Sequence, residues 1–380
     1  MRIAIVTESF PPDVNGVANS VVQVAGHLLR RGHQPVVIAP APSGTRRTNL
    51  DGQPYPVVRI PSVPVPRYHG FRLGLPTGRL TEALLAAAPD VVHLASPFVL
   101  GGRAASVAAR HGLPTVAVYQ TDVAAYARAY RMGWGGAAAW RRVRAIHNSA
   151  RRTLAPSTRA AADLIANGVE RIWLWGRGVD AERFHPDRRC PVLRRRLAPD
   201  GEVLVGYVGR LAPEKRVDLL AATSRLPGVR VVVVGDGPAR DDLVRALPGV
   251  TFLGMQHGDE LARIYASLDV FVHTGPHETF GQTLQEALAS GVPVVAPAAG
   301  GPVDLVNDGL TGTLVPPGDG PALARAVGVL AAEPALRAAY GAAARAAVGR
   351  RSWSVVGDEL IGHYRAVQVA PAAARRWATA

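Results

Sequence analysis

Two cations stand close together near the middle of the chain, directly after an apolar run that predicts a buried strand. Residues 203–208 lead into Gly209, and Arg210 and Lys215 follow, five positions apart. Parallel strands deliver such loop residues to the carboxyl edge of a sheet, where ligands bind. An arginine fork and a lysine point charge together suit a diphosphate. Lys215 is the single lysine among 43 basic residues, which favours a functional need over the alternative, two solvated loop cations.

Two glutamates lie at the start of a helix predicted over 280–290. Glu278 precedes this helix and Glu286 lies within it. At the helical rise their separation is about 12 Å, whereas the paired carboxylates of a retaining hydrolase lie about 5 Å apart. The spacing fits a ligand with two hydroxyl-bearing rings on either side of a diphosphate, such as a nucleotide sugar, and the N–H groups at Phe280 and Gly281 favour an anion. Two ordinary acids are the alternative interpretation.

The elements that must position these residues follow from the hydrophobic pattern. Strand-like runs alternate with helical patterns in both halves, which predicts an α/β fold of two doubly wound, Rossmann-like domains facing each other across a cleft. In the first half, strands are expected over 3–7, 35–39, 91–94, 115–119 and 172–174, and helices over 17–31, 81–88, 102–111, 137–153 and 158–167. The predicted divisions are a first domain over 1–175, a linker over 176–200, a second domain over 201–352, and a terminal segment over 353–380 whose helix crosses back to the first domain.

Composition restricts the class of protein. The 380 residues are 48% hydrophobic and 19% charged, which is typical of a globular chain and excludes a disordered one. No apolar run reaches the roughly 20 residues that a membrane-spanning helix needs. Glu8 interrupts the short apolar start, unlike a signal peptide. Cys190 is the single cysteine, so no disulfide forms within this sequence and we expect a cytoplasmic protein.

Charge is distributed unevenly. The formal net charge is +14, and the first 175 residues hold 20 arginines but only 8 acidic residues. Residues 123–162 contain no acidic residue; their basic and aromatic side chains are Arg128, Arg131, Arg141, Arg142, Arg144, Arg151, Arg152, Arg159, Tyr126, Tyr130, Trp134 and Trp140. A second basic and apolar segment spans 67–75. These segments suit an anionic membrane surface, which predicts peripheral attachment to the inner face of the plasma membrane. A coding bias toward arginine and a solvated helix face are the plain alternative.

Taken together, the motifs resemble those of the retaining glycosyltransferases of family 4, which have the GT-B fold. The matching segments are Glu278 with seven residues before Glu286, Gly209-Arg210 with Lys215, Thr7 to Pro12, Asn15-Gly16-Val17, and Trp175 to Asp180 with Phe184 to Pro186. The resemblance covers almost the whole chain and is strongest to actinobacterial GDP-mannose-dependent α-mannosyltransferases that act on lipid acceptors. It implies transfer of a hexose, mannose from GDP-mannose, to a lipid-linked or phosphorylated acceptor in an α linkage.

The resemblance also implies roles for individual residues. The implied sets are catalytic Arg210, Lys215 and Glu278, donor-binding Gly16, Gly209, Gly235, Phe280, Gly281 and Glu286, and an acceptor or sugar contact through Asn15, Gln120 and Asp122. Arg210 and Lys215 would neutralise the diphosphate leaving group. Glu278 would hold the sugar hydroxyls, and Glu286 the ribose hydroxyls. For Gly235, a plain tight turn is an equally good explanation.

The chain departs from many relatives after the strand expected over 115–119. Gln120 stands where those proteins have a histidine, and Asp122 follows two positions later. A glutamine can exchange hydrogen bonds with a sugar hydroxyl but cannot carry a proton, which argues against a catalytic histidine here. Asp122 is either a polar helper or a helix cap. No Asp-x-Asp pattern and no Cys/His cluster with zinc spacing occurs, so we expect no metal cofactor.

Three alternatives remain open from the sequence. The donor could be a UDP-sugar and the acceptor soluble, because nothing distinguishes guanine from uracil. A nicotinamide dehydrogenase also has two doubly wound domains, but the first strand here leads into Glu8-Ser9-Phe10-Pro11-Pro12 without a Gly-x-Gly-x-x-Gly motif. A nucleic-acid-binding protein is supported by charge alone. We expect a nucleotide sugar and an acceptor as partners, and no nucleic acid.

Overall fold

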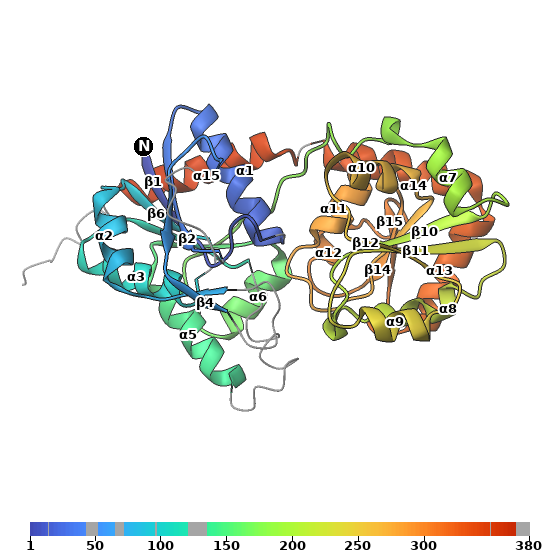
Figure 1. Ribbon diagram of the computed structural model, residues 1–380, viewed down its shortest axis with the longest axis horizontal. Helices are drawn as coiled ribbons and strands as arrows, with labels where there is room; N and C mark the ends of the chain where they lie inside the picture. The colour runs from blue at the N-terminus through green and yellow to red at the C-terminus, as the bar shows by residue number, and fades with distance from the viewer. Residues whose placement is uncertain are drawn as a thin grey trace, which may run out of the picture.

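The computed structural model describes residues 1–13, 15–42, 52–64, 72–95, 97–120, 135–349 and 351–369. These residues form two α/β domains side by side, the first drawn in blue to green and the second in yellow to orange (Figure 1). Two stretches of chain connect them: the segment after β9, and the passage from α14 into α15.

The first domain is built on a parallel sheet, whose seven strands among the described residues have the order β3-β2-β1-β6-β7-β8-β9. The strands are β1 (Arg2–Val6), β2 (Gln34–Pro40), β3 (Val57–Ile60), β6 (Val91–Leu94), β7 (Thr115–Val118), β8 (Arg152–Ala155) and β9 (Ile172–Leu174), with a small antiparallel pair of β4 (Ser62–Pro64) and β5 (Arg72–Gly74). The helices are α1 (Gly16–Arg30), α2 (Gly78–Ala86), α3 (Leu100–Arg110), α5 (Gly135–Ser149) and α6 (Thr158–Ala166).

Both faces of this sheet are covered, which explains why β1 is an unbroken apolar run. Ile3 and Ile5 share a core with α1 and the C-terminal helix, whereas Ala4 and Val6 share one with α2 and α3. Successive strand side chains point to opposite faces, so a strand between two helical layers needs an apolar residue at every position.

The second domain repeats this plan with a parallel sheet in the order β12-β11-β10-β13-β14-β15, six strands within the described part of the chain. The strands are β10 (Val203–Val208), β11 (Val229–Val234), β12 (Thr251–Gly254), β13 (Val270–Val272), β14 (Val294–Pro297) and β15 (Gly312–Val315). The helical elements are η2 (Pro213–Lys215), η3 (Val217–Leu219), α8 (Leu220–Thr223), α9 (Arg240–Ala246), α10 (Gly258–Ser267), α11 (Gln282–Ala289), α12 (Pro302–Leu305), α13 (Gly320–Ala332) and α14 (Pro334–Val348).

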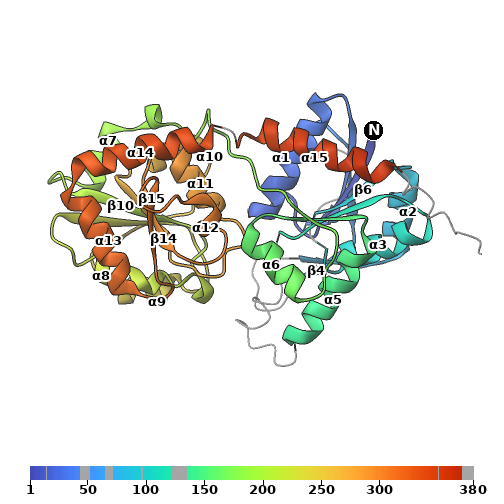
Figure 2. The ribbon, with the colours of Figure 1, turned by 180° about the vertical axis from the view of Figure 1, so that it is seen from behind.

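A long helix, α15 (Trp353–Gln368), returns the chain to the first domain and lies beside α1 (Figure 2). Its apolar face, including Leu360 and Tyr364, belongs to the same core as Ile3 of β1. The Tyr364 hydroxyl lies 2.6 Å from Nδ1 of the buried His93. On the other side of the helix, Asp358 pairs with His27 of α1 at 2.9 Å.

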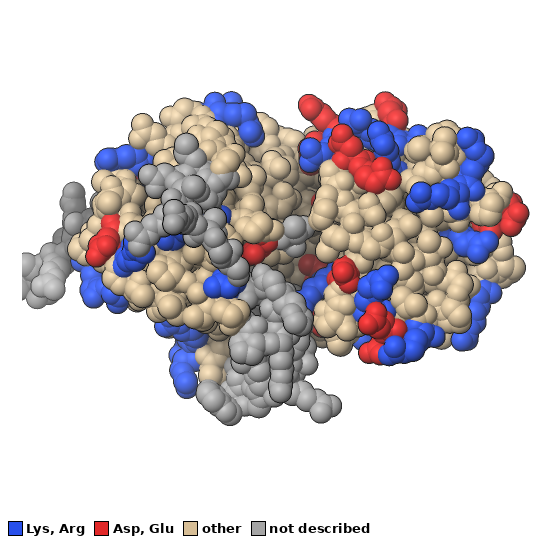
Figure 3. Space-filling view, in the orientation of Figure 1, with Lys and Arg blue, Asp and Glu red and all other residues tan. Residues whose placement is uncertain are grey.

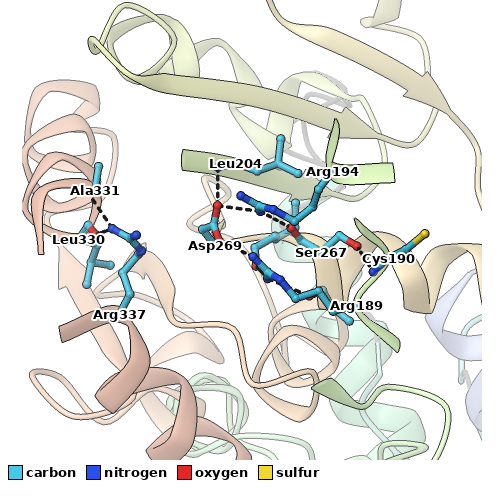
Figure 4. Close-up of polar contacts among 11 residues, drawn as sticks. Arg189, Cys190, Arg194, Leu204, Ser267, Asp269, Leu330, Ala331 and Arg337 are labelled. Carbon is cyan, nitrogen blue, oxygen red and sulfur yellow. Dashed lines mark hydrogen bonds and ion pairs between the residues drawn. The ribbon is translucent and has the colours of Figure 1, made fainter. Parts of the chain in front are cut away.

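The segment predicted as a linker over 176–200 contains two short helices, η1 (Pro186–Arg188) and α7 (Pro191–Leu197). These helices are fastened to the second domain through Asp269, whose carboxylate accepts hydrogen bonds from Arg189 at 2.9 Å and Arg194 at 2.8 Å (Figure 4). Leu193 and Leu197 of α7 lie in the core of the second domain. The latter part of this segment is therefore packed on the second domain.

The predicted fold class, two parallel-sheet Rossmann-like domains, is confirmed. Five strands were not predicted: β3, β4 and β5, which follow β2 along the chain, and also β8 and β15. The helix expected over 137–153 ends at Ser149, and residues 152–155 form β8; residues 312–315 form β15 at a sheet edge. Neither run shows a strand pattern by itself, because Arg152 and Thr153 are polar and Gly312 opens β15. Their neighbours in the sheet decide their conformation.

Candidate active site

A lysine–glutamate pair lies where two loops of the second domain meet. Lys215 ends η2, after β10, and Glu278 lies in the loop between β13 and α11. Lys215 Nζ is 2.8 Å from Glu278 Oε2, and the two side chains are 19% and 22% exposed. The Thr274 hydroxyl donates a hydrogen bond to the Lys215 carbonyl oxygen at 2.6 Å and so fixes the lysine loop. The structure thus brings together two residues that the sequence predicted as parts of one site.

The protonation of this cluster is set by burial and by neighbouring charges. Burial alone would raise the pKa of Glu278, but the charge of Lys215, with smaller effects of His273 and Arg177, lowers it to about 2. Burial lowers the pKa of His273 to about 4, and its Nε2 is 3.8 Å from Glu278 Oε2. At neutral pH an ionised Glu278 therefore lies beside a neutral His273 and a charged Lys215.

The loop that carries Glu278 is held by close backbone contacts. The Gly301 N–H donates to the Glu278 carbonyl oxygen at 2.7 Å, and a Cβ on Gly301 would lie 2.0 Å from the carbonyl oxygen of Phe280. Gly281 precedes α11 with a φ of +104°, which favours glycine. The first backbone N–H groups of a helix have no partner within it. The contact of the Phe280 and Gly281 backbone with a ligand stays a prediction.

Arg210 follows Gly209 at the end of β10. Its Nη1 lies 4.0 Å from Oε1 of Glu214, and its carbonyl oxygen accepts a hydrogen bond from the Tyr207 hydroxyl at 3.2 Å. Gly235 stands against Gly209: it has a φ of +132°, and a Cβ there would lie 2.0 Å from the Gly209 carbonyl oxygen. Packing between the loops after β10 and β11 therefore explains Gly235, and its contact with a donor stays a prediction.

Glu286 lies within α11, 9% exposed. Burial raises its pKa to about 7, against the lowering effect of the neighbouring Tyr265 and Gln282. Because α11 begins at Gln282, the helical rise applies only to the last part of the path from Glu278. The predicted separation of about 12 Å between Glu278 and Glu286 assumed the helical rise along the whole path. Because residues 278–281 lie in a loop, that assumption does not hold.

On the first domain, Asn15 caps α1. Its Oδ1 accepts hydrogen bonds from the backbone N–H groups of Val17 and Ala18, both at 3.0 Å, and its Nδ2 donates to Ser9 Oγ at 2.7 Å. The Asn15 amide thereby shapes the loop beside Gly16, and its predicted contact with an acceptor stays a prediction.

Glu8 lies near the start of the loop between β1 and α1, the loop that Asn15 ends. Its Oε1 accepts hydrogen bonds from the N–H groups of Val99 at 2.7 Å and Leu100 at 2.6 Å, at the start of α3. Burial raises the pKa of Glu8 to about 7 although these bonds oppose the shift. This carboxyl group therefore links the end of β1 to the loop after β6.

Gln120 lies at the boundary between the domains beside Arg177, a residue for which no role was predicted. The Gln120 carbonyl oxygen accepts a hydrogen bond from the Thr279 hydroxyl at 3.3 Å, and its Oε1 accepts one from Arg177 Nη2 at 2.9 Å. Arg177 follows β9 and is only 7% exposed. The sequence offers one indication of its importance, a charged residue between Gly176 and Gly178. That pattern does not reveal which groups the side chain contacts.

The predicted basic surface is only partly within the described residues. Asp122, Tyr126, Arg128, Tyr130, Arg131, Trp134 and residues 67–71 lie outside them. Arg141, Arg142 and Arg144 are exposed on α5, whereas Trp140 stacks on Tyr119 at 6.1 Å and Arg152 lies over Trp173 at 4.2 Å. Acidic side chains are few on the first domain in the view of Figure 3. Within the described residues, the exposed part of this surface therefore includes Arg141, Arg142 and Arg144 on α5 and Arg159 on α6.

The described residues offer neither a metal centre nor a membrane-spanning helix. No group of three or more His, Cys, Asp or Glu side chains there is arranged to hold a metal ion. In the same part of the chain, every helix is too short or too polar to cross a bilayer.

Known proteins are similar to this chain in sequence and in fold. Residues 14–183 match the model described as Glycosyltransferase Family 4, and residues 202–333 match Glycosyl transferases group 1. A GDP-mannose-dependent alpha-mannosyltransferase of Mycobacterium tuberculosis is 52% identical, covering 97% of each chain. One of the same name from Mycolicibacterium smegmatis is 51% identical, covering 97% of this chain and 98% of its own. The solved structure of sucrose-phosphate synthase from Thermosynechococcus elongatus has a TM-score of 0.85 at 23% identity, covering 97% of this chain and 99% of its own.

The structural likeness shows the fold, which is GT-B, as the resemblance implied. The sequence likeness extends through both domains and includes both sides of the site. The chain belongs to glycosyltransferase family 4.

Proposed function

We propose that this protein transfers mannose from GDP-mannose, with retention of the α configuration, to a lipid-linked or phosphorylated acceptor. The observation that carries the proposal is the 52% identity, over nearly the full length of both chains, to a protein whose name states the donor and the type of linkage.

The second domain supplies the chemistry that a nucleotide sugar needs. Arg210 and Lys215 both follow β10, five positions apart, and favour the negative charge that develops on the departing diphosphate. An ammonium group has three N–H donors, so the bond from Lys215 to Glu278 is compatible with a further bond to a phosphate oxygen. The ionised Glu278 accepts hydrogen bonds from sugar hydroxyls, and Glu286 accepts them from the ribose.

The transfer itself exchanges one bond at the anomeric carbon for another. The bond from that carbon to the diphosphate oxygen breaks, and the acceptor oxygen bonds to the carbon on the same face. The acceptor proton passes to the departing diphosphate oxygen, so no protein base is required at that step. This assignment agrees with a glutamine, which cannot take a proton, at position 120.

We infer that the reaction needs no divalent metal, because Arg210 and Lys215 provide positive charge where the diphosphate leaves. We also infer that the acceptor brings the enzyme to an anionic membrane surface from the cytoplasmic side. The exposed Arg141 and Arg144 on α5 support this second inference, since each cation near such a surface contributes about 1 kcal/mol.

A donor panel tests the proposal. Thermal melts with GDP-, UDP- and ADP-sugars should show the largest rise with GDP-mannose, since a bound donor stabilises by about 2.7 kcal/mol at a hundredfold excess over Kd. Turnover with the preferred donor then gives a product whose anomeric configuration NMR can read. Preference for a UDP-sugar, or a β-linked product, would contradict the proposal.

A further inference from the structure

Arg177 is an unusual residue for the place it occupies. It is the one arginine among the buried polar side chains of the described residues. Burial of a charge costs several kcal/mol unless other groups compensate it. The segment that carries Arg177 joins β9 to the second domain, so the side chain lies at the boundary of the two halves.

The surroundings of Arg177 come from both domains. Its Nη2 donates to Gln120 Oε1 at 2.9 Å. Its Nη1 fills the space beside Gly16, because a Cβ on that glycine would lie 2.6 Å from it. Glu278 of the second domain acts on it electrostatically: burial lowers the pKa of Arg177 to about 10, and the Glu278 charge opposes that shift. The guanidinium therefore remains charged at neutral pH.

The bond from Arg177 fixes the direction of the Gln120 amide. A guanidinium only donates hydrogen bonds, so the group that faces it must be the amide oxygen. The Gln120 NH2 group then points away from Arg177, and it meets no acceptor among the described residues. Gln120 consequently presents two N–H donors to an oxygen of the substrate.

Arg177 also sets the charge of the cleft. Arg210 lies near Glu214 at 4.0 Å, and Lys215 pairs with Glu278 at 2.8 Å. Within the described residues, the direct partner of Arg177 is the neutral Gln120 amide, and its Nε is buried without a hydrogen bond. Arg177 therefore supplies positive charge that no carboxylate of its own offsets, which favours a dianionic diphosphate.

We propose that Arg177 is a positioning residue for sugar transfer, which holds the Gln120 amide with its N–H groups toward the substrate and gives the cleft its surplus positive charge. This inference rests on the proposed function in so far as the substrate is a nucleotide sugar. It is independent of which sugar and which base the donor carries.

The variants Arg177→Met and Arg177→Lys distinguish the orientation of the Gln120 amide from the supply of positive charge. Arg177→Met removes both the charge and the bond, so kcat should fall roughly 10²-fold, as for a misplaced reacting group, and donor KM should rise roughly tenfold from the loss of one nearby unit charge. Arg177→Lys keeps the charge, so donor KM should stay near the wild-type value while kcat falls. Equal kinetics of Arg177→Met and wild type would overturn the proposal.

A double-mutant cycle tests the link to Gln120. In a Gln120→Leu background there is no amide to orient, so Arg177→Lys should change kcat less than about twofold. Gln120→Glu should keep or raise the melting temperature through a bond to Arg177, yet lower turnover, because it removes the N–H donors. Additive losses in kcat for Arg177→Lys and Gln120→Leu would overturn the positioning role.

Arg345→Met is the matched control. Arg345 Nη1 donates hydrogen bonds to the backbone carbonyl oxygens of Ala181, Phe184 and Ala289. Neither Gln120 nor Gly16 is among these partners. Its loss should lower the melting temperature and leave kcat and KM unchanged.

All kinetics use whichever donor the wild type turns over, so preference for UDP-glucose would contradict the proposed function without affecting this test. A binding measurement with GDP, weaker for Arg177→Met than for Arg177→Lys, gives a readout that does not need turnover.

Discussion

The two domains contribute different kinds of residue to the candidate site, and each domain supplies one face of it. On the second-domain face, charged side chains follow neighbouring strands, and each cation has a carboxylate nearby: Arg210 with Glu214, and Lys215 with Glu278. On the first-domain face, a glycine and a neutral amide surround one buried arginine, Arg177. One face therefore has nearly balanced charges and the other holds an unbalanced one.

This difference indicates how work is divided between the domains. Ion pairs on the second-domain face hold their members in fixed positions before a donor binds, which limits the reorganisation needed when charge develops on the leaving group. On the first-domain face, packing against Gly16 and a single hydrogen bond to Gln120 hold the Arg177 side chain in place. We expect charge changes on the second-domain face to affect turnover most, and changes on the first-domain surface to affect encounter with the acceptor.

Removal of Lys215 should have the largest effect. Lys215→Ala should lower turnover roughly 10²–10³-fold, by analogy with the loss of one oxyanion donor. Lys215→Arg should recover only part of this, because the site is narrow: Glu278 Oε2 is 2.8 Å from Nζ, and a Cβ on Gly275 would already lie 3.4 Å from Lys215 Cδ. Initial rates against donor concentration measure the effect.

Arg216→Ala is the control for this comparison. Arg216 is exposed and pairs with Asp218 at 3.1 Å, a surface pair of a kind that contributes at most about 1 kcal/mol. Its rates should remain within about twofold of wild type. A thermal melt of each variant excludes unfolding as the cause, and near-normal turnover of Lys215→Ala would show that the second-domain face is not the leaving-group site.

The second-domain face also makes donor binding depend on pH, through Glu286. With its pKa raised to about 7, this carboxyl group is mainly neutral at pH 6 and mainly ionised at pH 8. The ionised form is the better acceptor for ribose hydroxyls, so affinity for GDP-mannose should rise with pH, roughly tenfold over this range if only that form binds. Calorimetric titration of the intact donor avoids the ionisation of a terminal phosphate.

Glu286→Gln separates this effect from others that change with pH. Its amide cannot titrate, so its affinity should be weaker and flat between pH 6 and 8. The same tenfold rise in that variant would assign the pH dependence to another group, of which the buried Glu8, with its pKa also raised to about 7, is the first to examine.

The contrast between the faces also explains what the sequence could reveal. Arg210, Lys215, Glu278 and Glu286 could be proposed because charged residues after or between apolar runs are visible in a single sequence, and the structure places Lys215 against Glu278. The repeated strand–helix pattern predicted both sheets. Arg177 was not found, because its importance lies in contacts with Gln120, 57 positions earlier, and with Gly16. Strand β8 was missed for a similar reason: pairing with β7 and β9 decides its conformation.

On the first-domain surface we expect a smaller effect, on membrane encounter. Replacement of Arg141 and Arg144 by Ala should weaken binding to vesicles with anionic lipid roughly three- to tenfold, because each cation contributes up to about 1 kcal/mol and salt screens part of it. Arg195 and Arg196, exposed on α7 of the second domain, are the matched control pair. Sedimentation with neutral and anionic vesicles measures binding, and equal loss in both pairs would remove any special role of α5.

The smallest effect should come from metal removal, and it tests whether the cations of the two faces suffice. Arg177, Arg210 and Lys215 contribute three positive charges, against which Glu214 and Glu278 offer two negative ones. A divalent ion would need carboxylate or phosphate oxygens as ligands, and both carboxylates already lie beside cations. Saturating EDTA should therefore change the initial rate less than about twofold, no more than the loss of one exposed ion pair would. Restoration by magnesium or manganese of an activity lost in EDTA would show that the leaving group needs more positive charge than these three side chains supply.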